Sequence, residues 1–315
     1  MPRAAVVVCV LGAFLGAGPA RAVPPEACDP KAGSCWTPPV GARWQYQLEA
    51  KGKRHAASGG IDVGICAKPP GGGPCVAPDV FDIDLWVDPA LTGGAALVNS
   101  AAVDAIHAAG KRAICYVQAG TAERFRPDYP AFVAFDEACG GCLLGEPFSR
   151  VFPDEHWLNL NDGEGQRAFV LGIVEARVAL CAEAGFDGVE FDVVDAYAQG
   201  AATTGWEISY ETQLEYDQQL ANLAHRYGLT AALKNDLGQL EALLPFFDYA
   251  VNEQCFEFDE CAGYAAWIAA GKAVFSVEYR LPRRRFCEEA NAAGFGAIKK
   301  ARSFRLFAKP WKPCQ

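Results

Sequence analysis

The 315-residue sequence predicts an α/β protein folded as a single (β/α)8 barrel of the TIM type. Short apolar segments with strand character alternate along the chain with segments of helical periodicity. Three of the predicted helices end at a glycine directly before an apolar strand, which is typical of repeated β-α units. The length is normal for one such barrel, and 51% of the residues are hydrophobic, which is enough for a large core.

Eight segments are predicted to be the barrel strands because each is short, apolar and bounded by turn residues. They span residues 44–48, 81–86, 113–119, 156–160, 187–194, 230–236, 249–254 and 273–279. Helices are predicted at 95–109, 164–184 and 209–227, each followed by a glycine (Gly110, Gly185 and Gly228). No composition change within residues 44–315 indicates a second domain, so this range is predicted to be the barrel domain.

The N-terminal residues have the form of a signal peptide. A basic start is followed by an apolar run from Ala4 to Gly16, and Ala20-Arg21-Ala22 fits a signal-peptidase site. A membrane anchor is the alternative, but the apolar run is shorter than the roughly 20 residues that a span needs. We therefore expect residues 1–22 to be removed, leaving a secreted protein, extracellular or periplasmic, with no membrane contact. Residues 23–43 form a Pro- and Gly-rich leader.

The cysteine count agrees with export. Thirteen cysteines are present, and twelve remain once Cys9 leaves with the signal peptide. Their sequence context favours the pairs Cys28/Cys35, Cys66/Cys75, Cys255/Cys261, Cys287/Cys314 and Cys139/Cys142. We expect Cys115 and Cys181 to be buried free thiols, because they lie in a strand-like and a helix-like segment.

The mature protein is strongly acidic. Removal of Arg3 and Arg21 takes the net charge from −10 to −12, since 26 basic and 38 acidic residues remain. This charge disfavours a nucleic-acid partner and would attract a cationic polymer, although much of it could simply be solvated surface.

The stretch GFDGVEFDVVDAY, residues 185–197, contains the main candidate site. Alternation along this strand places Glu190 and Asp192 on the face opposite Val189 and Phe191, and Asp195 follows in the loop. Carboxylates this close repel each other, so such clusters persist mainly where they bind cations or perform acid/base chemistry. Capping carboxylates with a salt bridge are the simpler interpretation of this stretch taken alone.

The other predicted strands also end in polar residues, which in a barrel meet at one face. The candidates for substrate binding are Asp84, Tyr116, Glu190, Tyr197, Lys234, Asn252 and Glu278. The sequence has no G-x-S-x-G, H-E-x-x-H or phosphate-binding glycine motif, so we predict neither a metal nor a cofactor. Trp86, Tyr116, Tyr197, Trp206 and Phe256 lie at or just beyond strand ends.

Two carboxylates among aromatic and amide side chains are what cleavage of a glycosidic bond requires. The fifth and seventh predicted strands lie two places apart, so inward side chains could bring their carboxyl groups to roughly 5–9 Å. We therefore pair Asp192 with Glu253 as the catalytic carboxylates, with Asp195 as a further catalytic candidate. A salt bridge to Lys234 is an equally simple explanation for Glu253 alone.

At these residues the chain resembles glycoside hydrolase family 114. The blocks that carry the resemblance are FDIDLWVDPA, GKRAICYVQAG, GFDGVEFDVVDAY, LKND, FDYAVNEQCFEFDEC and GKAVFSVEY, in order from about Trp44 to Phe286. The resemblance implies a secreted (β/α)8 endo-α-1,4-polygalactosaminidase, whose acidic pair falls on Asp192 or Asp195 and on Glu253. The sequence departs from the family pattern at Phe191 and Val193, where proline and asparagine are more usual, and in a longer loop around Cys66–Cys75.

The predicted function is thus endo-acting hydrolysis of an α-1,4-linked galactosamine polymer, a cationic polysaccharide, by a monomer that retains anomeric configuration. Three alternatives stay open: a non-catalytic carbohydrate-binding barrel, a hydrolase of another amino-sugar polymer, and a Ca²⁺ site formed by the acidic cluster.

Overall fold

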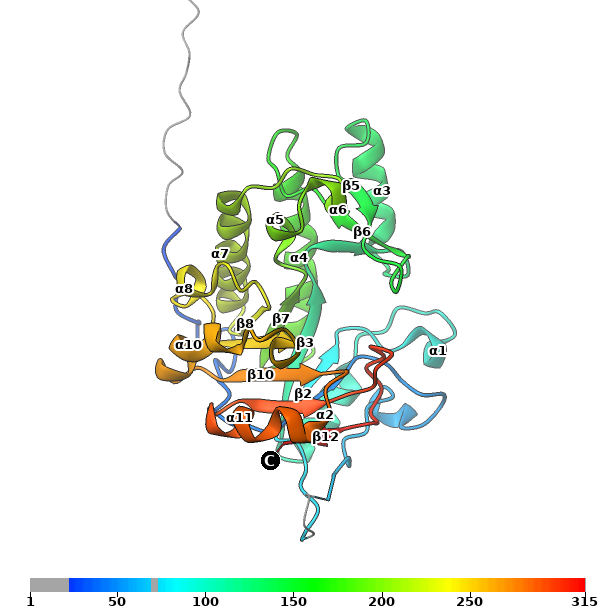
Figure 1. Cartoon of the computed structure of the whole chain (residues 1–315). Coiled ribbons are helices and arrows are strands. Elements are labelled where there is room, and N and C mark those ends of the chain that lie inside the picture. The colour runs from blue at the N-terminus through cyan, green and yellow to red at the C-terminus, as the bar shows by residue number, and fades with distance from the viewer. Residues whose placement is uncertain (1–22, 69–72, 315) are drawn as a thin grey trace, which may run out of the picture.

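The computed structural model describes residues 23–68 and 73–314, so the predicted signal peptide lies outside the described residues. It confirms a (β/α)8 barrel of the TIM type (Figure 1). Eight parallel strands follow one another around the sheet, and β12 (Lys312–Pro313) pairs antiparallel with the last of them. The eight are β1 (Trp44–Gln47), β2 (Val80–Asp84), β3 (Arg112–Gln118), β7 (Gly188–Asp192), β8 (Thr230–Lys234), β9 (Tyr249–Glu253), β10 (Val274–Glu278) and β11 (Gly296–Lys299).

The first and last parallel strands meet at a seam. A Cβ added to Gly296 would lie 2.4 Å from the carbonyl oxygen of Ala42, so glycine is required for this close approach of the two backbones. Lys300 donates to Gln45 Oε1 at 3.0 Å, and the Trp311 indole donates to the Trp44 carbonyl at 2.8 Å. These bonds hold the two ends of the curled sheet together.

The helices between the strands confirm the predicted β-α alternation, and the three predicted helices are α2 (Ser100–Ala108), α4 (Gln166–Glu183) and α7 (Tyr210–Arg226). The other described helices are α1 (Pro89–Thr92), α3 (Tyr129–Ala138), α5 (Ala196–Gln199), α6 (Ala201–Thr204), α8 (Leu240–Leu243), α9 (Cys255–Phe258), α10 (Ala265–Ala269) and α11 (Cys287–Ala292), with 3₁₀ turns at Ala56–Ser58, Cys261–Tyr264 and Arg283–Arg285. No helix in the described part of the chain has the length and apolarity to cross a membrane.

The structure corrects one strand of the predicted barrel. Residues 156–160 do contain a strand, β6 (Glu155–Leu158), but it pairs antiparallel with β4 (Thr121–Glu123) and β5 (Leu144–Pro147) in a separate sheet. This three-stranded sheet is inserted between β3 and α4, and Figure 1 shows it beyond the end of the barrel together with α3. β7 therefore follows β3 directly, and β11, which the sequence analysis missed, completes the eight.

Six disulfides join the twelve cysteines of the described residues. Five are the predicted pairs, Cys28–Cys35, Cys66–Cys75, Cys139–Cys142, Cys255–Cys261 and Cys287–Cys314. The expectation of free thiols at Cys115 and Cys181 is wrong, because these two form a disulfide that joins the outer face of β3 to α4. A full set of disulfides is typical of proteins that fold in an oxidising compartment.

Alternation along the strands separates two environments. On β7, the apolar Val189 and Phe191 are buried, whereas Glu190 bonds Tyr46 of β1 across the barrel interior. Trp44 and Phe275 stack in the same interior with ring centroids 5.0 Å apart. The interior is thus aromatic at its lower end and becomes polar toward the carboxyl ends of the strands, where the candidate site lies.

Candidate active site

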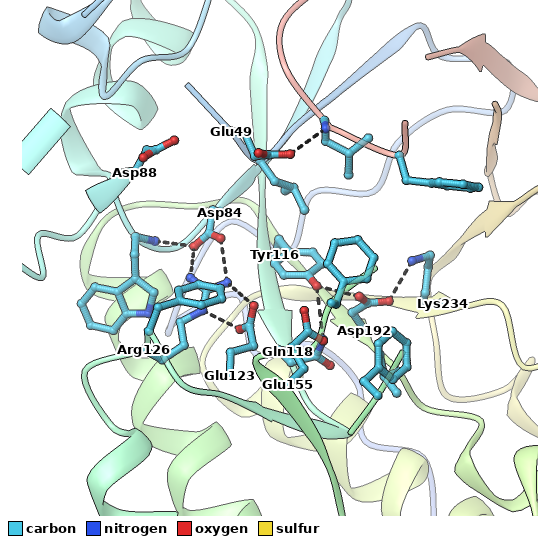
Figure 2. A pocket seen from close by; sticks show the side chains of 18 of the residues that line it. Glu49, Asp84, Asp88, Tyr116, Gln118, Glu123, Arg126, Glu155, Asp192 and Lys234 are labelled. Carbon is cyan, nitrogen blue, oxygen red and sulfur yellow. Dashed lines mark hydrogen bonds and ion pairs between the residues drawn. The ribbon is translucent and has the colours of Figure 1, made fainter. Parts of the chain in front are cut away.

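A cavity of about 830 Å³ opens at the carboxyl ends of the barrel strands (Figure 2). Its walls come from the ends of β2, β3, β7, β8 and β9, from the inserted sheet, and from the segment that follows β11. Eight acidic and three basic side chains line it: Glu49, Asp84, Asp88, Glu123, Glu155, Asp192, Asp195 and Glu253, with Arg126, Lys234 and Arg305. The cavity is therefore strongly anionic when these groups are ionised.

Lys234, the last residue of β8, connects three carboxylates. Its ammonium lies 2.7 Å from Asp192 Oδ1, 3.4 Å from Glu253 Oε2 and 3.6 Å from Glu190 Oε1. Burial lowers the pKa of Lys234, but the three carboxylates outweigh that effect and leave the pKa well above its ordinary value. Lys234 is therefore a permanent cation at the base of the cavity.

Asp192 is held in its ionised form. Its Oδ1 accepts from Lys234, and its Oδ2 accepts from the Tyr116 hydroxyl at 2.6 Å. Burial raises the pKa of Asp192, but the Lys234 ammonium and these hydrogen bonds outweigh it, so the pKa lies below its ordinary value. The backbone beyond Asp192 is tightly packed, because a Cβ on Gly120 would overlap the Val193 carbonyl. Only glycine fits at Gly120, and the position of Asp192 depends on it.

Below Lys234, two acids share the barrel interior. The Tyr46 hydroxyl donates to Glu190 Oε1 at 3.0 Å, and Glu190 is fully buried. Neither oxygen of Asp82 accepts a hydrogen bond from an N–H or O–H group of the described residues. The polar group next to Asp82 is the carboxyl group of Glu190. Burial, followed by the charge of Glu190, raises the pKa of Asp82 well above its ordinary value. Burial also raises the pKa of Glu190, to about 7, so this pair adds at most one negative charge beneath Lys234.

Glu253, the last residue of β9, faces the cavity from the strand two places beyond β7. Its carboxylate accepts a hydrogen bond from the Tyr279 hydroxyl and forms an ion pair with the Lys234 ammonium. The Asn235 side chain accepts from the Glu253 amide at 2.9 Å and from Asn252 at 3.3 Å. Asn252 also caps the next turn by accepting from the Cys255 amide, so it positions the backbone around Glu253 and does not line the cavity.

Arg126, in the inserted segment, was not identified from the sequence. It donates to both Asp84 oxygens at 2.6 and 2.8 Å and to Glu123 at 2.5 and 3.2 Å, and all three side chains are buried. Asp84, predicted to bind substrate, lines the cavity as the partner of this arginine. Sequence reasoning missed Arg126 because its partners lie 42 and 3 positions away and no local motif marks the contact.

Glu155, the first residue of β6, was also missed. It lines the cavity, is 8% exposed, and accepts a hydrogen bond from Thr121 Oγ1 at 3.3 Å. Burial, and then the nearby charges of Glu123 and Asp192, raise the pKa of Glu155 to about 8. The cavity therefore contains a carboxyl group that holds a proton at neutral pH beside the ionised Asp192.

The remaining predicted residues lie at or outside the edge of the cavity. Asp195 lines it and accepts from Gln199 at 3.0 Å, and burial raises its pKa. Tyr197 donates to Asp236 at 3.0 Å and Glu278 accepts from the Phe256 amide, and neither is among the lining residues. The structure thus brings Asp192, Glu253, Lys234 and Tyr116 together and leaves Tyr197, Asn252 and Glu278 in supporting contacts.

The described residues include no group of three or more histidine, cysteine, aspartate or glutamate side chains arranged to hold a metal ion. The acids of the cavity are instead distributed around Lys234 and Arg126. The polar side chains that line the described cavity carry carboxyl, carboxamide, hydroxyl, ammonium and guanidinium groups.

Carboxylates that face one another in an open cavity at the carboxyl ends of a (β/α)8 barrel are the arrangement that O-glycosyl hydrolases use. The sequence matches the model of Glycoside-hydrolase family GH114 over residues 25–311, and the chain belongs to this family. Among proteins with curated descriptions, none matches the sequence significantly.

Solved structures share the fold. The chain is similar to Ega3 of Aspergillus fumigatus, solved in complex with galactosamine, with 26% identity, a TM-score of 0.66, and coverage of 86% of this chain and 96% of that one. The glycoside hydrolase domain of PelA from Pseudomonas aeruginosa has 12% identity and a TM-score of 0.52, covering 83% and 95%. An α-galactosidase from Thermus thermophilus has 12% identity and a TM-score of 0.50, covering 89% and 59%. At these identities, the last two comparisons bear on the fold alone.

Proposed function

We propose that this protein is an exported, endo-acting hydrolase of α-1,4-linked galactosamine polymer, with Asp192 and Glu253 as its two catalytic carboxylates. One observation carries the proposal: both carboxylates contact the same ammonium. Asp192 Oδ1 and Glu253 Oε2 lie 2.7 and 3.4 Å from Lys234 Nζ, so these two oxygens are at most about 6.1 Å apart. Inverting enzymes need about 6.5–9.5 Å and retaining enzymes about 5–5.5 Å, so the bound favours retention.

Asp192 is the better nucleophile. Lys234 and Tyr116 keep it ionised, whereas Asp195 bonds Gln199 and does not contact Lys234. Before the first step, Glu253 takes up a proton from solvent. Asp192 then forms a bond to the anomeric carbon as the bond from that carbon to the glycosidic oxygen breaks, and Glu253 gives its proton to the departing oxygen. In the second step, Glu253 takes a proton from water, the water oxygen bonds to the anomeric carbon, and Asp192 is released.

The charge of the cavity supports an amino-sugar substrate. A polymer of galactosamine is cationic, and eight acidic residues against three basic ones line the cavity. The net charge of −12 expected for the mature chain acts in the same direction. Family membership and the similarity to Ega3, which was solved with galactosamine, support the same choice, and six disulfides support export.

Reducing-end release from de-N-acetylated galactosaminogalactan tests this proposal. We expect the wild-type protein to cleave it, and Asp192→Asn and Glu253→Gln each to reduce kcat by roughly 10²–10⁴-fold or more, because each removes a group that acts in the transition state. Glu207→Gln is the matched control, since Glu207 is exposed and does not line the cavity. Wild-type rates in both catalytic variants would contradict the assignment, and retention of polymer with no release would instead favour a carbohydrate-binding barrel.

A further inference from the structure

We propose that Glu155 recognises the ammonium group of an amino sugar bound in this cavity, an inference that rests on the proposed function and names one contact within it. Glu155 begins β6 of the inserted sheet, directly opposite Glu123 of β4. Its side chain lines the cavity (Figure 2), close enough to Asp192 for the two charges to interact. The group lies on the cavity wall, where it can contact a bound sugar while Asp192 faces the anomeric carbon.

Among the described residues Glu155 makes no ion pair, unlike the four acids Asp84, Glu123, Asp192 and Glu253 of the same cavity. Arg126 pairs with Asp84 and Glu123, and Lys234 pairs with Asp192 and Glu253. Among the residues that the structure describes, the hydroxyl of Thr121 is the one group that donates to the Glu155 side chain. The Glu155 side chain is more than nine-tenths buried in an acidic wall but borders the cavity. A ligand bound in the cavity can therefore supply the positive charge that Glu155 lacks.

The charged groups that face Glu155 come from three directions. Glu123 lies across the strand pair, Asp192 comes from the end of β7, and Arg126 is engaged by two other acids. Burial and the two anions keep the pKa of Glu155 near 8, so the free protein holds a proton there. An ammonium ion bound at Glu155 favours the carboxylate, and the carboxyl proton then passes to the buffer. A neutral N-acetyl group leaves that proton in place.

Binding calorimetry in two buffers of different ionisation enthalpy tests this linkage. The titrant is a short α-1,4-galactosamine oligosaccharide at about pH 6, where its amines and Glu155 both carry protons. Glu253→Gln serves as the background, so that no hydrolysis contributes heat. We expect release of up to about one proton per site, and no release with the N-acetylated oligosaccharide.

Adding Glu155→Gln to the Glu253→Gln variant tests whether Glu155 is the source of the released proton. It should abolish proton release and weaken binding of the amino oligosaccharide about tenfold or more, because a charge-assisted hydrogen bond is lost. Glu146→Gln, on the exposed part of the same inserted sheet, should change neither value. Equal heats in both buffers, or proton release that survives Glu155→Gln, would overturn the inference even if the polymer is cleaved. Proton-linked binding without any cleavage by the wild type would instead contradict the proposed function.

Discussion

Lys234 controls the charge state of the site. A buried ammonium without partners would be strongly destabilised, and three carboxylates packed this closely would repel one another. The Lys234 ammonium and the three carboxylates therefore stabilise one another, and Asp192 is the carboxylate closest to the ammonium, at 2.7 Å. The shared proton on Asp82 and Glu190 reduces the negative charge below Lys234. The ionised state of Asp192 thus depends mainly on one side chain.

Replacing Lys234 by methionine should shift the pH dependence of activity. The pKa of Asp192 lies below its ordinary value because of Lys234, so wild-type activity should persist as the pH falls through the acid range. Without the ammonium the pKa of Asp192 rises, and the acidic limb of kcat/KM should move to higher pH. The measurement is reducing-end release across pH 3–8 (about one point per half unit). Lys51→Met is the exposed control, and an unmoved acidic limb would contradict this role.

The same variant should lose stability in a pH-dependent way. Asp192 has a lower pKa in the folded protein than in the unfolded chain, so its ionisation stabilises the fold at any pH above the unfolded-state pKa. This stabilisation is lost as the pH falls through the folded-state pKa. Lys234→Met removes it and leaves buried carboxylates unpaired, which costs about 3–5 kcal/mol at neutral pH. The deficit in Tm, measured by thermal denaturation, should therefore shrink in acid. A constant deficit from neutral to acid pH would argue for a packing effect.

At the level of elements, the inserted sheet forms one wall of the cavity. The exposed Phe125 and Phe152, the half-buried Phe148 and the buried Trp157 line the cavity beside Glu155. Phe148 packs on Trp157 with ring centroids 4.9 Å apart, which fixes the rings next to the open end. Apolar rings at this position offer a surface for the faces of sugar units beyond the one that reacts.

Phe152→Ala should weaken the use of long chains more than short ones. Phe152 is 38% exposed and lies on the turn before β6, so its removal should leave stability within about 0.5 kcal/mol. Loss of a ring contact worth about 0.5–1.5 kcal/mol predicts a KM several-fold higher for polymer, with little change for the shortest cleavable oligosaccharide. Phe258→Ala, exposed but outside the cavity, is the control. Equal effects of Phe152→Ala on long and short substrates would contradict an extended binding wall.

These elements also mark the limit of sequence-based prediction. Alternation located the acidic end of β7 and the face that carries Glu190 and Asp192, because that pattern is local. It did not distinguish β6 from a barrel strand, since both are short apolar runs and their pairing is set by residues far away in the chain. The sequence GAIK of β11 contains one β-branched residue beside a glycine, an alanine and a lysine, so its composition does not indicate a strand. Glu155 and Arg126 were missed for the same reason, because the inserted sheet brings them to the site.

At the scale of the whole molecule, charge and fold act together. The expected mature chain carries −12, and its described cavity has five more acidic than basic side chains. A cleft lined by charges of one sign and enclosed by low-dielectric walls concentrates their electric field, which raises the local concentration of an oppositely charged ligand. A cationic polymer should therefore be attracted over distances of about a Debye length, roughly 10 Å at 0.1 M salt.

Salt should consequently slow the capture of polymer without slowing the reaction of bound substrate. Raising NaCl from about 0.05 to about 0.5 M screens the field, so kcat/KM on galactosamine polymer should fall several-fold or more. The kcat at saturating polymer is an internal control, because Asp192 and Glu253 are only partly exposed beside Lys234 and react after the complex has formed. Partial N-acetylation of the polymer removes positive charges and should reduce the salt dependence in proportion. A kcat/KM that is independent of salt on the fully deacetylated polymer would show that the acidic cavity does not attract its substrate by charge, and would direct attention to a neutral glycan.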